Sequence, residues 1–542
     1  MKTKSKSLFM FASVAVIFLI IIIGILSISK SSDSSGKTLD ELLKKMDCDV
    51  TESTPEMASV SLDDTSLYDE LPEIDKYPMI VTGYGDINLE IFSSPEKAGD
   101  DTNGWLVDIA KDFNNEHYTT SDGKTISISV RDVSSGLAAD YIISSKYVPE
   151  LYTPSNELWG IYATSQKADL KTIKDSLIGN TAGILIKKGS NYKTFDDIYN
   201  AVVAGEITLG YTNPQVSSAG MNALLTILQN YGEDGFASFQ KNVPYVAYNT
   251  VQMQESVSSG TLNAMVSEYQ TYINDKELKS AYDFIPYGIR HDNPLYACNY
   301  ESMDSATKEA IDIFTDYATN NTAQSLATKY GFNQNTDYTS DYEVSGSDVK
   351  HALEVYKKDK DSGKDVIAVF VADCSGSMDG DAILQLKESL TNGMSYINDS
   401  CYVGLVSYSS NVNIEVPIAQ FNLTQKAYFQ NAINNMSANG GTATYEAVCV
   451  GMNMIKEAKE THPDAKCMLF VLSDGYANGD YNIRDIQGMV KSEEVPIYTI
   501  AYTNAADKDE LSALSNINEA TCINADSDDV IYKIKSLFNA NL

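Results

Sequence analysis

One loop near the carboxyl end of the chain carries three oxygen side chains at alternate positions. It follows the apolar run DVIAVFVA and supplies Asp373, Ser375 and Ser377. Side chains at alternate positions of an extended turn point to the same side, so these three oxygens can converge on one cation. A carboxylate with hydroxyls is a hard oxygen set that suits Mg²⁺, Ca²⁺ or Mn²⁺ and suits zinc poorly. The spacing therefore predicts a divalent-metal loop.

Two further segments offer ligands of the same kind. The stretch NGGT ends at Thr442 ahead of a long helical pattern, and the apolar run AKCMLFVLS leads to Asp474. Apolar runs unbroken by charge are typical of parallel strands buried on both faces. In an open α/β sheet the carboxyl ends of such strands meet at one edge, where ligands bind. We therefore expect Thr442 and Asp474 to join the three residues of the first loop in one metal site.

These three segments resemble, in order and spacing, the von Willebrand factor type A domain with its metal-ion-dependent adhesion site. The Asp-x-Ser-x-Ser, Gly-Gly-Thr and Ser-Asp-Gly elements all match, over about residues 364–540. The resemblance implies hydroxyl ligands from serine and threonine and direct or water-mediated ligands from aspartate: Ser375, Ser377, Thr442, Asp373 and Asp474. It also implies that one metal position is left for a Glu or Asp of a protein partner, with Mg²⁺ as the first ion to consider. The alternatives are an inert site that holds metal for folding alone, or no metal at all.

The region between about residues 76 and 336 alternates strand-like apolar runs with helical patterns, which is typical of an α/β architecture. Small hydroxyl-rich loops follow several of the expected strands: Ser93-Ser94-Pro95, Ser134-Ser135-Gly136, Pro154-Ser155-Asn156 and Ser217-Ser218-Ala219. Such loops lead into helices and expose backbone N–H groups and hydroxyls. They therefore predict a cradle for a small anionic or polar ligand.

Three stretches of this region resemble the type II fold of bacterial extracellular solute-binding proteins: PELYTPSNELW, NPQVSSAGMNALLTIL and IDIFTDYATNNTAQSLATKYGF. In that family two α/β lobes close on a ligand through a hinge, and the likeness covers roughly residues 78–336. The resemblance implies ligand contacts at one residue of each serine loop and at a tyrosine of the far lobe: Ser94, Ser135, Ser155, Ser218 and Tyr269. Helix capping is the alternative role of the serines. No arginine, lysine or aspartate in these loops identifies the ligand.

The amino-terminal segment from Leu8 to Ile28 is apolar and carries no charge. A helix needs roughly 20 such residues to cross a bilayer. Three lysines precede the segment, which places the amino end in the cytoplasm and the bulk of the chain outside. We therefore expect a single-pass anchor in the cell membrane, and a cleaved signal peptide is the alternative.

The formal net charge of −34 excludes one class of partner and favours others. An acidic surface repels nucleic acid and anionic lipid, while it concentrates divalent cations and basic groups nearby. We therefore expect no nucleic-acid binding and a membrane contact through the amino-terminal helix only. The seven cysteines are odd in number and irregular in spacing, which favours buried free thiols over a disulfide framework.

The expected fold class is α/β: a two-lobed solute-binding-like domain and then a doubly wound, mostly parallel sheet, on one amino-terminal transmembrane helix. The expected order is a cytoplasmic tail (1–7), an anchor (8–28), an acidic stalk (29–75), the two-lobed domain (76–336), a linker (337–363) and the type A domain (364–540).

Two functions follow from this organisation. The first is an anchored extracellular binding protein that captures an acidic group of a protein partner through the metal and a small ligand in the middle domain. The second is the solute-capturing component of a transport system, with the type A domain as a docking module. The sequence carries no G-x-S-x-G elbow, P-loop or H-E-x-x-H motif, so we predict that the chain is not an enzyme.

Overall fold

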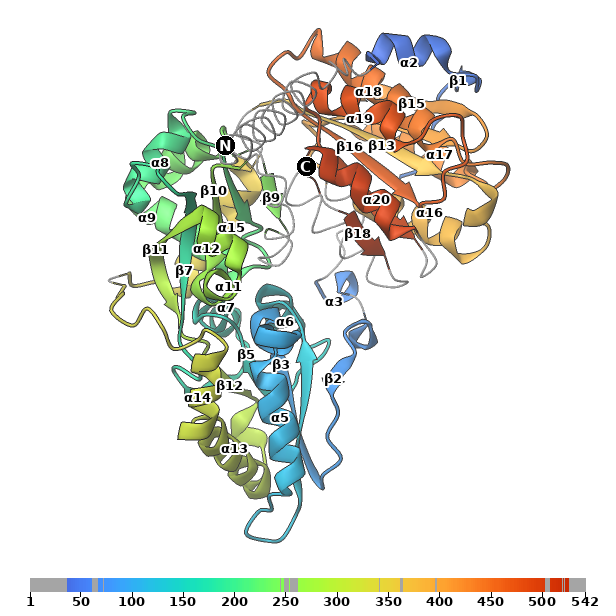
Figure 1. Ribbon diagram of the computed structural model, residues 1–542. Helices are drawn as coiled ribbons and strands as arrows, with labels where there is room; N and C mark the ends of the chain where they lie inside the picture. The colour runs from blue at the N-terminus through green and yellow to red at the C-terminus, as the bar shows by residue number, and fades with distance from the viewer. Residues whose placement is uncertain are drawn as a thin grey trace, which may run out of the picture.

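The computed structural model describes residues 37–60, 67–71, 73–243, 245–247, 253, 262–340, 342–360, 364–394, 397–502, 507–518, 520 and 522–525. These residues form three β-sheets with helices packed around them (Figure 1). The first two sheets come from the middle of the chain, and the third comes mainly from its carboxyl-terminal part.

The first sheet has six strands in the order β2-β4-β3-β5-β12-β6. The strands are β2 (Met79–Val81), β3 (Ile87–Ser93), β4 (Ile126–Asp132), β5 (Leu151–Thr153), β6 (Leu170–Lys174) and β12 (Leu295–Cys298). The longer helices near these strands in sequence are α5 (Trp105–Glu116), α6 (Ser135–Ser144), α7 (Leu158–Ser165), α13 (Ser305–Ala318) and α14 (Asn321–Lys329). The shorter ones are α3 (Leu67–Glu70), η1 (Ile74–Lys76), α4 (Pro95–Ala98), η2 (Asp101–Asn103) and η3 (Tyr300–Ser302). Because β3 is parallel to β4 and β5, the carboxyl ends of these three strands share one edge.

The second sheet has five strands in the order β11-β7-β10-β8-β9. The strands are β7 (Asn180–Lys187), β8 (Leu209–Thr212), β9 (Tyr245–Ala247), β10 (Ala264–Glu268) and β11 (Tyr282–His291), and the helices are α8 (Phe195–Val203), α9 (Ser218–Gln240), α11 (Tyr269–Asn274) and α12 (Lys276–Ala281). A Cβ at Gly220 would lie 2.0 Å from the carbonyl oxygen of Thr212. Glycine therefore allows the first turn of α9 to start directly against β8.

The chain passes between the two sheets at two places. β6 of the first sheet leads into β7 of the second, and β11 of the second leads back into β12 of the first. The two sheets are therefore the cores of two lobes joined by paired connections. This arrangement confirms the two-lobed α/β architecture expected for the middle region.

The third sheet has seven strands in the order β1-β15-β14-β13-β16-β17-β18. The strands are β1 (Val50–Glu52), β13 (Val366–Asp373), β14 (Tyr402–Tyr408), β15 (Val412–Gln420), β16 (Lys466–Ser473), β17 (Ile497–Tyr502) and β18 (Cys522–Ala525), and the helices are α2 (Leu39–Lys45), η4 (Gly376–Met378), α16 (Asp381–Gly393), α17 (Leu423–Asn435), α18 (Thr444–Lys459), α19 (Ile483–Glu493), α20 (Lys508–Ser515) and η6 (Asn516–Asn518). The central strands β14, β13, β16 and β17 are parallel, and β15 is antiparallel to β14. Successive residues of β13 pack into cores on opposite faces, so every residue of this strand is buried.

Part of the expected acidic stalk is folded rather than extended. Helix α2 packs against α18, and strand β1 pairs in parallel with β15 at the edge of the third sheet. The prediction of a stalk over 29–75 is therefore wrong for these residues. The composition is polar, but Leu39 and Leu42 of α2 are buried in the core of the third sheet, and that periodicity is what decides the local structure.

The expected linker also carries structure. Helix α15 (Gly346–Asp359) begins with a capping box in which Ser345 and Asp348 each bond the other's backbone N–H. Its buried face packs against α7 and α9, which come from the two sides of the middle region. The connection to the third sheet is therefore a helix seated on both lobes.

Two further expectations concern the membrane and the cysteines. The predicted anchor at 8–28 lies outside the described residues, and no helix within the described part of the chain is long and apolar enough to cross a bilayer. All seven cysteines are free, and five of them are buried, as their apolar surroundings predict.

Two leucines of α16 provide a test of the packing described for the third sheet. Leu386 is fully buried, whereas Leu384 on the same helix is 61% exposed. We expect Leu386→Ala to lower the free energy of unfolding by about 2–5 kcal/mol because it leaves a cavity. Leu384→Ala should change it by less than about 0.5 kcal/mol. Urea unfolding of both variants measures the difference, and equal losses would contradict the assigned faces of α16.

Candidate metal centre and interlobe site

Asp373 lies at the carboxyl end of β13 with no exposed surface. Its Oδ1 accepts a hydrogen bond from the backbone N–H of Ser375 at 2.8 Å. Its Oδ2 accepts from Ser473 Oγ at 2.6 Å and from Tyr408 Oη at 3.2 Å. These two hydroxyls come from the last residues of the strands on either side of β13. The carboxylate is thus fixed by three adjacent strands at one edge of the sheet.

Burial raises the pKa of the Asp373 carboxyl to about 6, and the charge of Asp474 acts in the same direction. The hydrogen bonds from Ser473 and Ser375 oppose this shift. A buried carboxylate is costly unless it is paired or coordinates a metal. The protein contacts of Asp373 are hydroxyls and an N–H group, so a cation is the partner that would complete its environment.

The loop after β13 presents two hydroxyls to the same region. Ser375 Oγ and Ser377 Oγ lie 3.0 Å apart, with Ser375 buried and Ser377 exposed. The loop is tied to the loop before α18, because the backbone N–H of Gly376 donates to the carbonyl of Gly440 at 3.1 Å. One cation could therefore reach both hydroxyls from the solvent side.

Thr442 lies two residues beyond Gly440 and is bonded to the loop that follows β16. Its backbone N–H donates to Asn478 Oδ1 at 2.7 Å, and its carbonyl accepts from the Asn478 backbone N–H at 2.9 Å. Asn478 belongs to the loop that starts with Asp474, which is almost completely buried. The two loops are thus locked together by one asparagine.

The structure brings the five predicted metal ligands onto three neighbouring loops at one sheet edge. These residues are Asp373, Ser375, Ser377, Thr442 and Asp474. Two carboxylates and three hydroxyls form a hard oxygen set that fits Mg²⁺, Mn²⁺ or Ca²⁺. In the part of the chain that the structure describes, no group of three or more His, Cys, Asp and Glu side chains could hold a metal ion. The hydroxyl-based set is thus a different kind of site from a carboxylate or imidazole cluster.

Three residues of this arrangement were not anticipated from the sequence. Tyr408 and Ser473 hold the Asp373 carboxylate, and Asn478 clamps Thr442. Ser473 lies within the Ser-Asp-Gly element, so its position carried a signal. Tyr408 and Asn478 act through contacts between loops that are distant in sequence, and no local pattern marks them.

The four serines predicted for the middle region lie buried between the lobes. Ser135 Oγ and Ser155 Oγ are 3.3 Å apart, and the Ser155 backbone N–H donates to Ser135 Oγ at 3.2 Å. The backbone carbonyl of Ser218 accepts from Asn156 Nδ2 at 3.4 Å, which joins the second lobe to the first. Ser94, at the start of α4, contacts Glu96 and Lys97 through its hydroxyl.

Helix capping does not explain these serines. Ser94, Ser134 and Ser217 occupy the N-cap positions of α4, α6 and α9, and none of them makes a side-chain capping hydrogen bond. The hydroxyls of Ser134, Thr153 and Ser218 are also buried without any hydrogen-bond partner among the described residues. Buried hydroxyls normally have partners, so these three leave room for a polar ligand group.

A charged network that the serine loops did not reveal lies beside them. The Lys97 side chain is completely buried, and its Nζ donates to Asn293 Oδ1 at 2.8 Å and lies 3.2 Å from Glu96 Oε1. Burial lowers the pKa of Lys97, and the Glu96 charge opposes this effect. Glu268 Oε1 of the second lobe lies 2.8 Å from His291 Nδ1. Lys97 lies only three residues after Ser94, a predicted ligand contact, but no pattern in the sequence indicates that its side chain is buried.

Tyr269, predicted on the far lobe, begins α11, and its ring packs edge-on against Phe284 at 5.1 Å between centroids and near Tyr272. Within the described residues, no hydrogen bond connects Tyr269 to the four serines. Its role as a ligand contact stays a prediction.

Two family models match this chain in adjacent regions. Residues 98–333 match the model of the bacterial extracellular solute-binding protein, and residues 368–539 match that of the von Willebrand factor type A domain. Among curated proteins, inter-alpha-trypsin inhibitor heavy chain H3 of Bos taurus is 28% identical over 173 residues, which cover 30% of this chain and 19% of the relative. A von Willebrand factor A domain-containing protein of Dictyostelium discoideum is 27% identical over 177 residues, covering 31% of this chain and 18% of that protein. The chain thus spans about a fifth of the length of the curated relatives it matches.

Solved structures of proteins of both kinds align with part of this chain. A von Willebrand factor type A protein from Catenulispora acidiphila aligns with a TM-score of 0.30 at 16% identity, covering 32% of this chain and 42% of that one. The sulfate-binding protein SubI of Mycobacterium tuberculosis H37Rv aligns with a TM-score of 0.35 at 14% identity, covering 49% and 98%. A periplasmic thiamin binding protein aligns with a TM-score of 0.39 at 11% identity, covering 52% and 99%.

The order of these matches agrees with the order of the sheets, since the two lobes precede the seven-stranded sheet. The chain therefore carries a region of the bacterial extracellular solute-binding protein family followed by a von Willebrand factor type A domain.

Proposed function

We propose that this chain is an extracellular binding protein whose type A domain holds a divalent cation and uses it to bind an acidic side chain of a protein partner. The buried Asp373 carboxylate, fixed at the sheet edge without a cationic contact, carries this proposal. The bound cation would supply positive charge at that edge and an open position for a Glu or Asp carboxylate. Mg²⁺ is the first candidate, and Mn²⁺ and Ca²⁺ suit the same oxygens.

The loops around the proposed cation have a composition that suits an acidic partner. The stretches 409–411 (SSN), 437–443 (SANGGTA) and 475–479 (GYANG) contain no charged residue, although the whole chain has a net charge of −34. Charges farther than about 8 Å are largely screened at physiological ionic strength. These uncharged stretches therefore matter more than the total charge for the approach of a carboxylate. Two exposed acids lie close to the loops in sequence: Asp480 directly follows the third stretch, and Asp379 lies two residues after Ser377.

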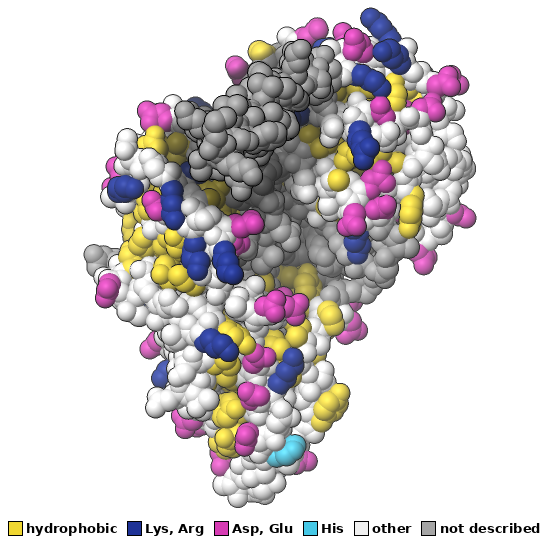
Figure 2. All heavy atoms as spheres, viewed as in Figure 1, with side chains coloured by type: hydrophobic (Ala, Val, Ile, Leu, Met, Phe, Trp, Pro, Cys, Tyr) yellow, Lys and Arg dark blue, Asp and Glu magenta, His cyan; other side chains and the backbone are white. Residues whose placement is uncertain are grey.

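The face of the molecule in Figure 2 does not favour a nucleic-acid partner. On the face in Figure 2, Lys and Arg side chains are scattered among Asp and Glu and form no continuous basic patch. Such a surface offers no footprint for a nucleic acid backbone. The match to an extracellular solute-binding family supports a location outside the cell, and the predicted anchor at 8–28 would hold the chain at the membrane.

Substitution of Asp373 tests the metal centre. Asp373→Asn keeps the shape of the side chain but removes the buried charge, so we expect Mg²⁺ affinity to fall by at least about tenfold. The stability of the metal-free protein should be unchanged or higher, because an uncompensated buried charge is lost. Isothermal calorimetry of the full chain with Mg²⁺, Mn²⁺ and Ca²⁺ measures the affinities.

Asp379→Asn is the matched control, because Asp379 is exposed six residues later on the same segment. It removes one negative charge without touching the proposed ligands and should bind Mg²⁺ as the wild type does. If the wild-type chain binds none of the three ions, the proposal of a metal centre is wrong.

The interlobe site supports a second function, the capture of a small polar solute. The unpartnered hydroxyls of Ser134, Thr153 and Ser218 favour it, since buried hydroxyls normally have hydrogen-bond partners. The chain would then act as the solute-capturing component of a transport system, with the type A domain as a docking module. Thermal unfolding with a panel of inorganic phosphate, sulfate, amino acids and monosaccharides separates the two functions. A solute at 100 times its Kd should stabilise the chain by about 2.7 kcal/mol.

The buried ion pair beside this site provides a separate test. Lys97→Met removes a fully buried ammonium and leaves Glu96 without its counter-charge. Breaking a buried pair in this way costs about 3–5 kcal/mol. Lys124→Met is the control, since Lys124 pairs with Asp122 in a half-exposed position. Its loss should change the free energy of unfolding by less than about 0.5 kcal/mol. Urea unfolding that gives the same value for both variants would contradict the buried network.

A further inference from the structure

Residues 37–58, which we name the strap, come before the two lobes in sequence but lie on the type A domain in space (Figure 1). We propose that the strap positions the metal-binding loops, so that its release from the domain lowers the affinity for the cation. This inference rests on the proposed metal function. Three sets of contacts carry it: the seat of α2, the pairing of β1 and the bonds to the turn between β14 and β15.

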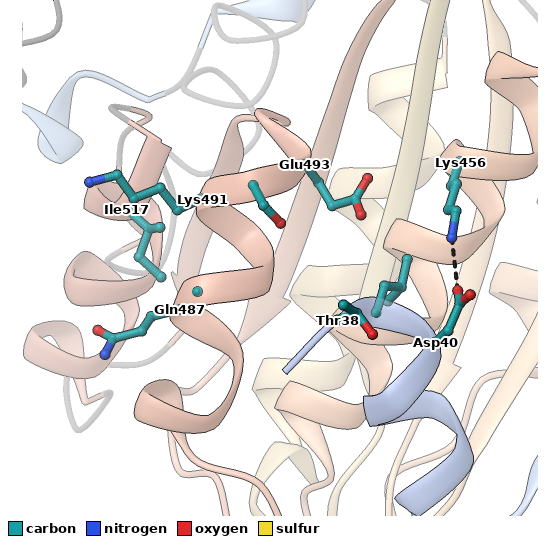
Figure 3. A pocket seen from close by; sticks show the side chains of 10 residues that line it. Thr38, Asp40, Lys456, Gln487, Lys491, Glu493 and Ile517 are labelled. Carbon is teal, nitrogen blue, oxygen red and sulfur yellow. Dashed lines mark hydrogen bonds and ion pairs between the residues drawn. The ribbon is translucent and has the colours of Figure 1, made fainter. Parts of the chain in front are cut away.

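The first set holds α2 against α18 and α19. Leu39 and Leu42 are buried in the core that also contains much of α18. The Leu42 carbonyl accepts from Tyr481 Oη at 2.6 Å. Asp40 Oδ1 lies 2.8 Å from Lys456 Nζ, as Figure 3 shows, and Lys37 Nζ lies 2.9 Å from an oxygen of Asp485. Buried leucines therefore attach α2 to the domain, and two ion pairs and a hydrogen bond fix its orientation.

The second set adds the strap to the sheet as its edge strand. Residues Val50–Glu52 pair in parallel with residues 412–414 of β15. Thr51 Oγ1 donates to Asn413 Oδ1 at 2.9 Å, and the Ser53 backbone N–H donates to the Ile414 carbonyl at 2.9 Å. Farther along, the Ala58 backbone N–H donates to the carbonyl of Ala427 in α17 at 3.1 Å. The strap thus spans the outer edge of the domain.

The third set connects the strap to the metal site. The Asp49 backbone N–H donates to Asn411 Oδ1 at 3.1 Å, and its carbonyl accepts from the backbone N–H of Val412 at 3.0 Å. Asn411 lies in the turn between β14 and β15. The two residues before it in this turn, Ser409 and Ser410, hold the Gly-Gly-Thr loop. Gly441 N–H donates to Ser410 Oγ at 2.8 Å, and Ala443 N–H donates to the Ser409 carbonyl at 2.8 Å.

Thr442 lies between the two residues that the turn holds. A shift of the 409–411 turn would therefore move a proposed metal ligand directly, through bonds on both of its sides. The Asp49 contacts fix this turn from the outside. The route from the strap to Thr442 combines the hydrogen bonds of Asn411, Ser410 and Ser409 with the short backbone segments that join these residues.

The contact between α2 and α19 is incomplete. A pocket lies between the two helices, lined by Thr38 and Asp40 of the strap and by Gln487 and Lys491 of α19 (Figure 3). All three residues of β1 are exposed. Leu39 and Leu42 are the buried apolar residues of α2, so the loss of Leu42 should weaken the contact of α2 with the domain.

Two variants of the full chain test the inference, with Mg²⁺ alone as the probe. Leu42→Ala loosens α2, and Asn411→Ala removes one exposed side-chain link between the strap and the turn. We expect each variant to lower the Mg²⁺ affinity by about fivefold or more. Leu42→Met keeps an apolar side chain of similar size at this buried position, so its Mg²⁺ affinity should equal that of the wild type. Asn434→Ala on α17 is the control for the loss of an exposed asparagine away from the turn. Calorimetry measures the affinity, and hydrogen exchange of residues 39–52 measures release of the strap.

The outcomes separate the inference from the proposal on which it depends. Wild-type binding with weaker binding in both variants supports the inference. Wild-type binding that is unchanged in Leu42→Ala, while hydrogen exchange shows a released strap, overturns the inference and leaves the metal centre intact. The same holds if Asn411→Ala binds like Asn434→Ala. A wild-type chain that binds no Mg²⁺ overturns both.

Discussion

The Asp373 carboxylate is buried at the edge of an apolar sheet, where hydroxyls of the two flanking strands hold it. Transfer of a carboxylate out of water is costly, and hydroxyl contacts offset only part of that cost. The strands and loops beside Asp373 supply oxygens or hold them in place: Ser473 and Tyr408 bond the carboxylate, and Asn478 holds Thr442. The divalent cation that we propose would offset the cost of this burial.

The interlobe region meets a similar constraint in a different way. There, a buried ammonium at Lys97 lies beside Glu96, so the charges are satisfied within the protein. The neutral hydroxyls of Ser134, Thr153 and Ser218 are the groups left without partners. The carboxylate of Asp373 at the sheet edge of the type A domain therefore lacks a positive counter-charge. The three hydroxyls between the lobes lack hydrogen-bond partners. This difference is why we propose a cation for the first site and a small polar solute for the second.

The residues that could be predicted from the sequence are those whose role depends on local spacing. Asp373 and Ser375 follow a buried strand directly, and a short loop leaves them few positions. Asn478 and Tyr408 act across the sheet edge, and their partners are fixed only when the strands pair. The middle-region serines were predicted because they lie in hydroxyl-rich loops that follow expected strands, while Lys97 was not predicted because no local pattern in the sequence marks a buried ammonium. The strap was missed because its acidic composition outweighed two leucines, Leu39 and Leu42, spaced for a helix.

The position of the strap changes how the two parts of the chain relate to each other. Because the type A sheet uses β1 as well as β13 to β18, the two-lobed region lies between segments of one sheet and is connected to it at both ends. At the second connection α15 packs on α7 and α9, and Gln240 Nε2 donates to the Lys360 carbonyl at 3.0 Å. Lys364 Nζ donates to the Lys241 carbonyl at 3.2 Å. These contacts join the chain before the third sheet to the two-lobed region, whereas the contacts of the strap reach the turn beside the proposed metal-binding loops.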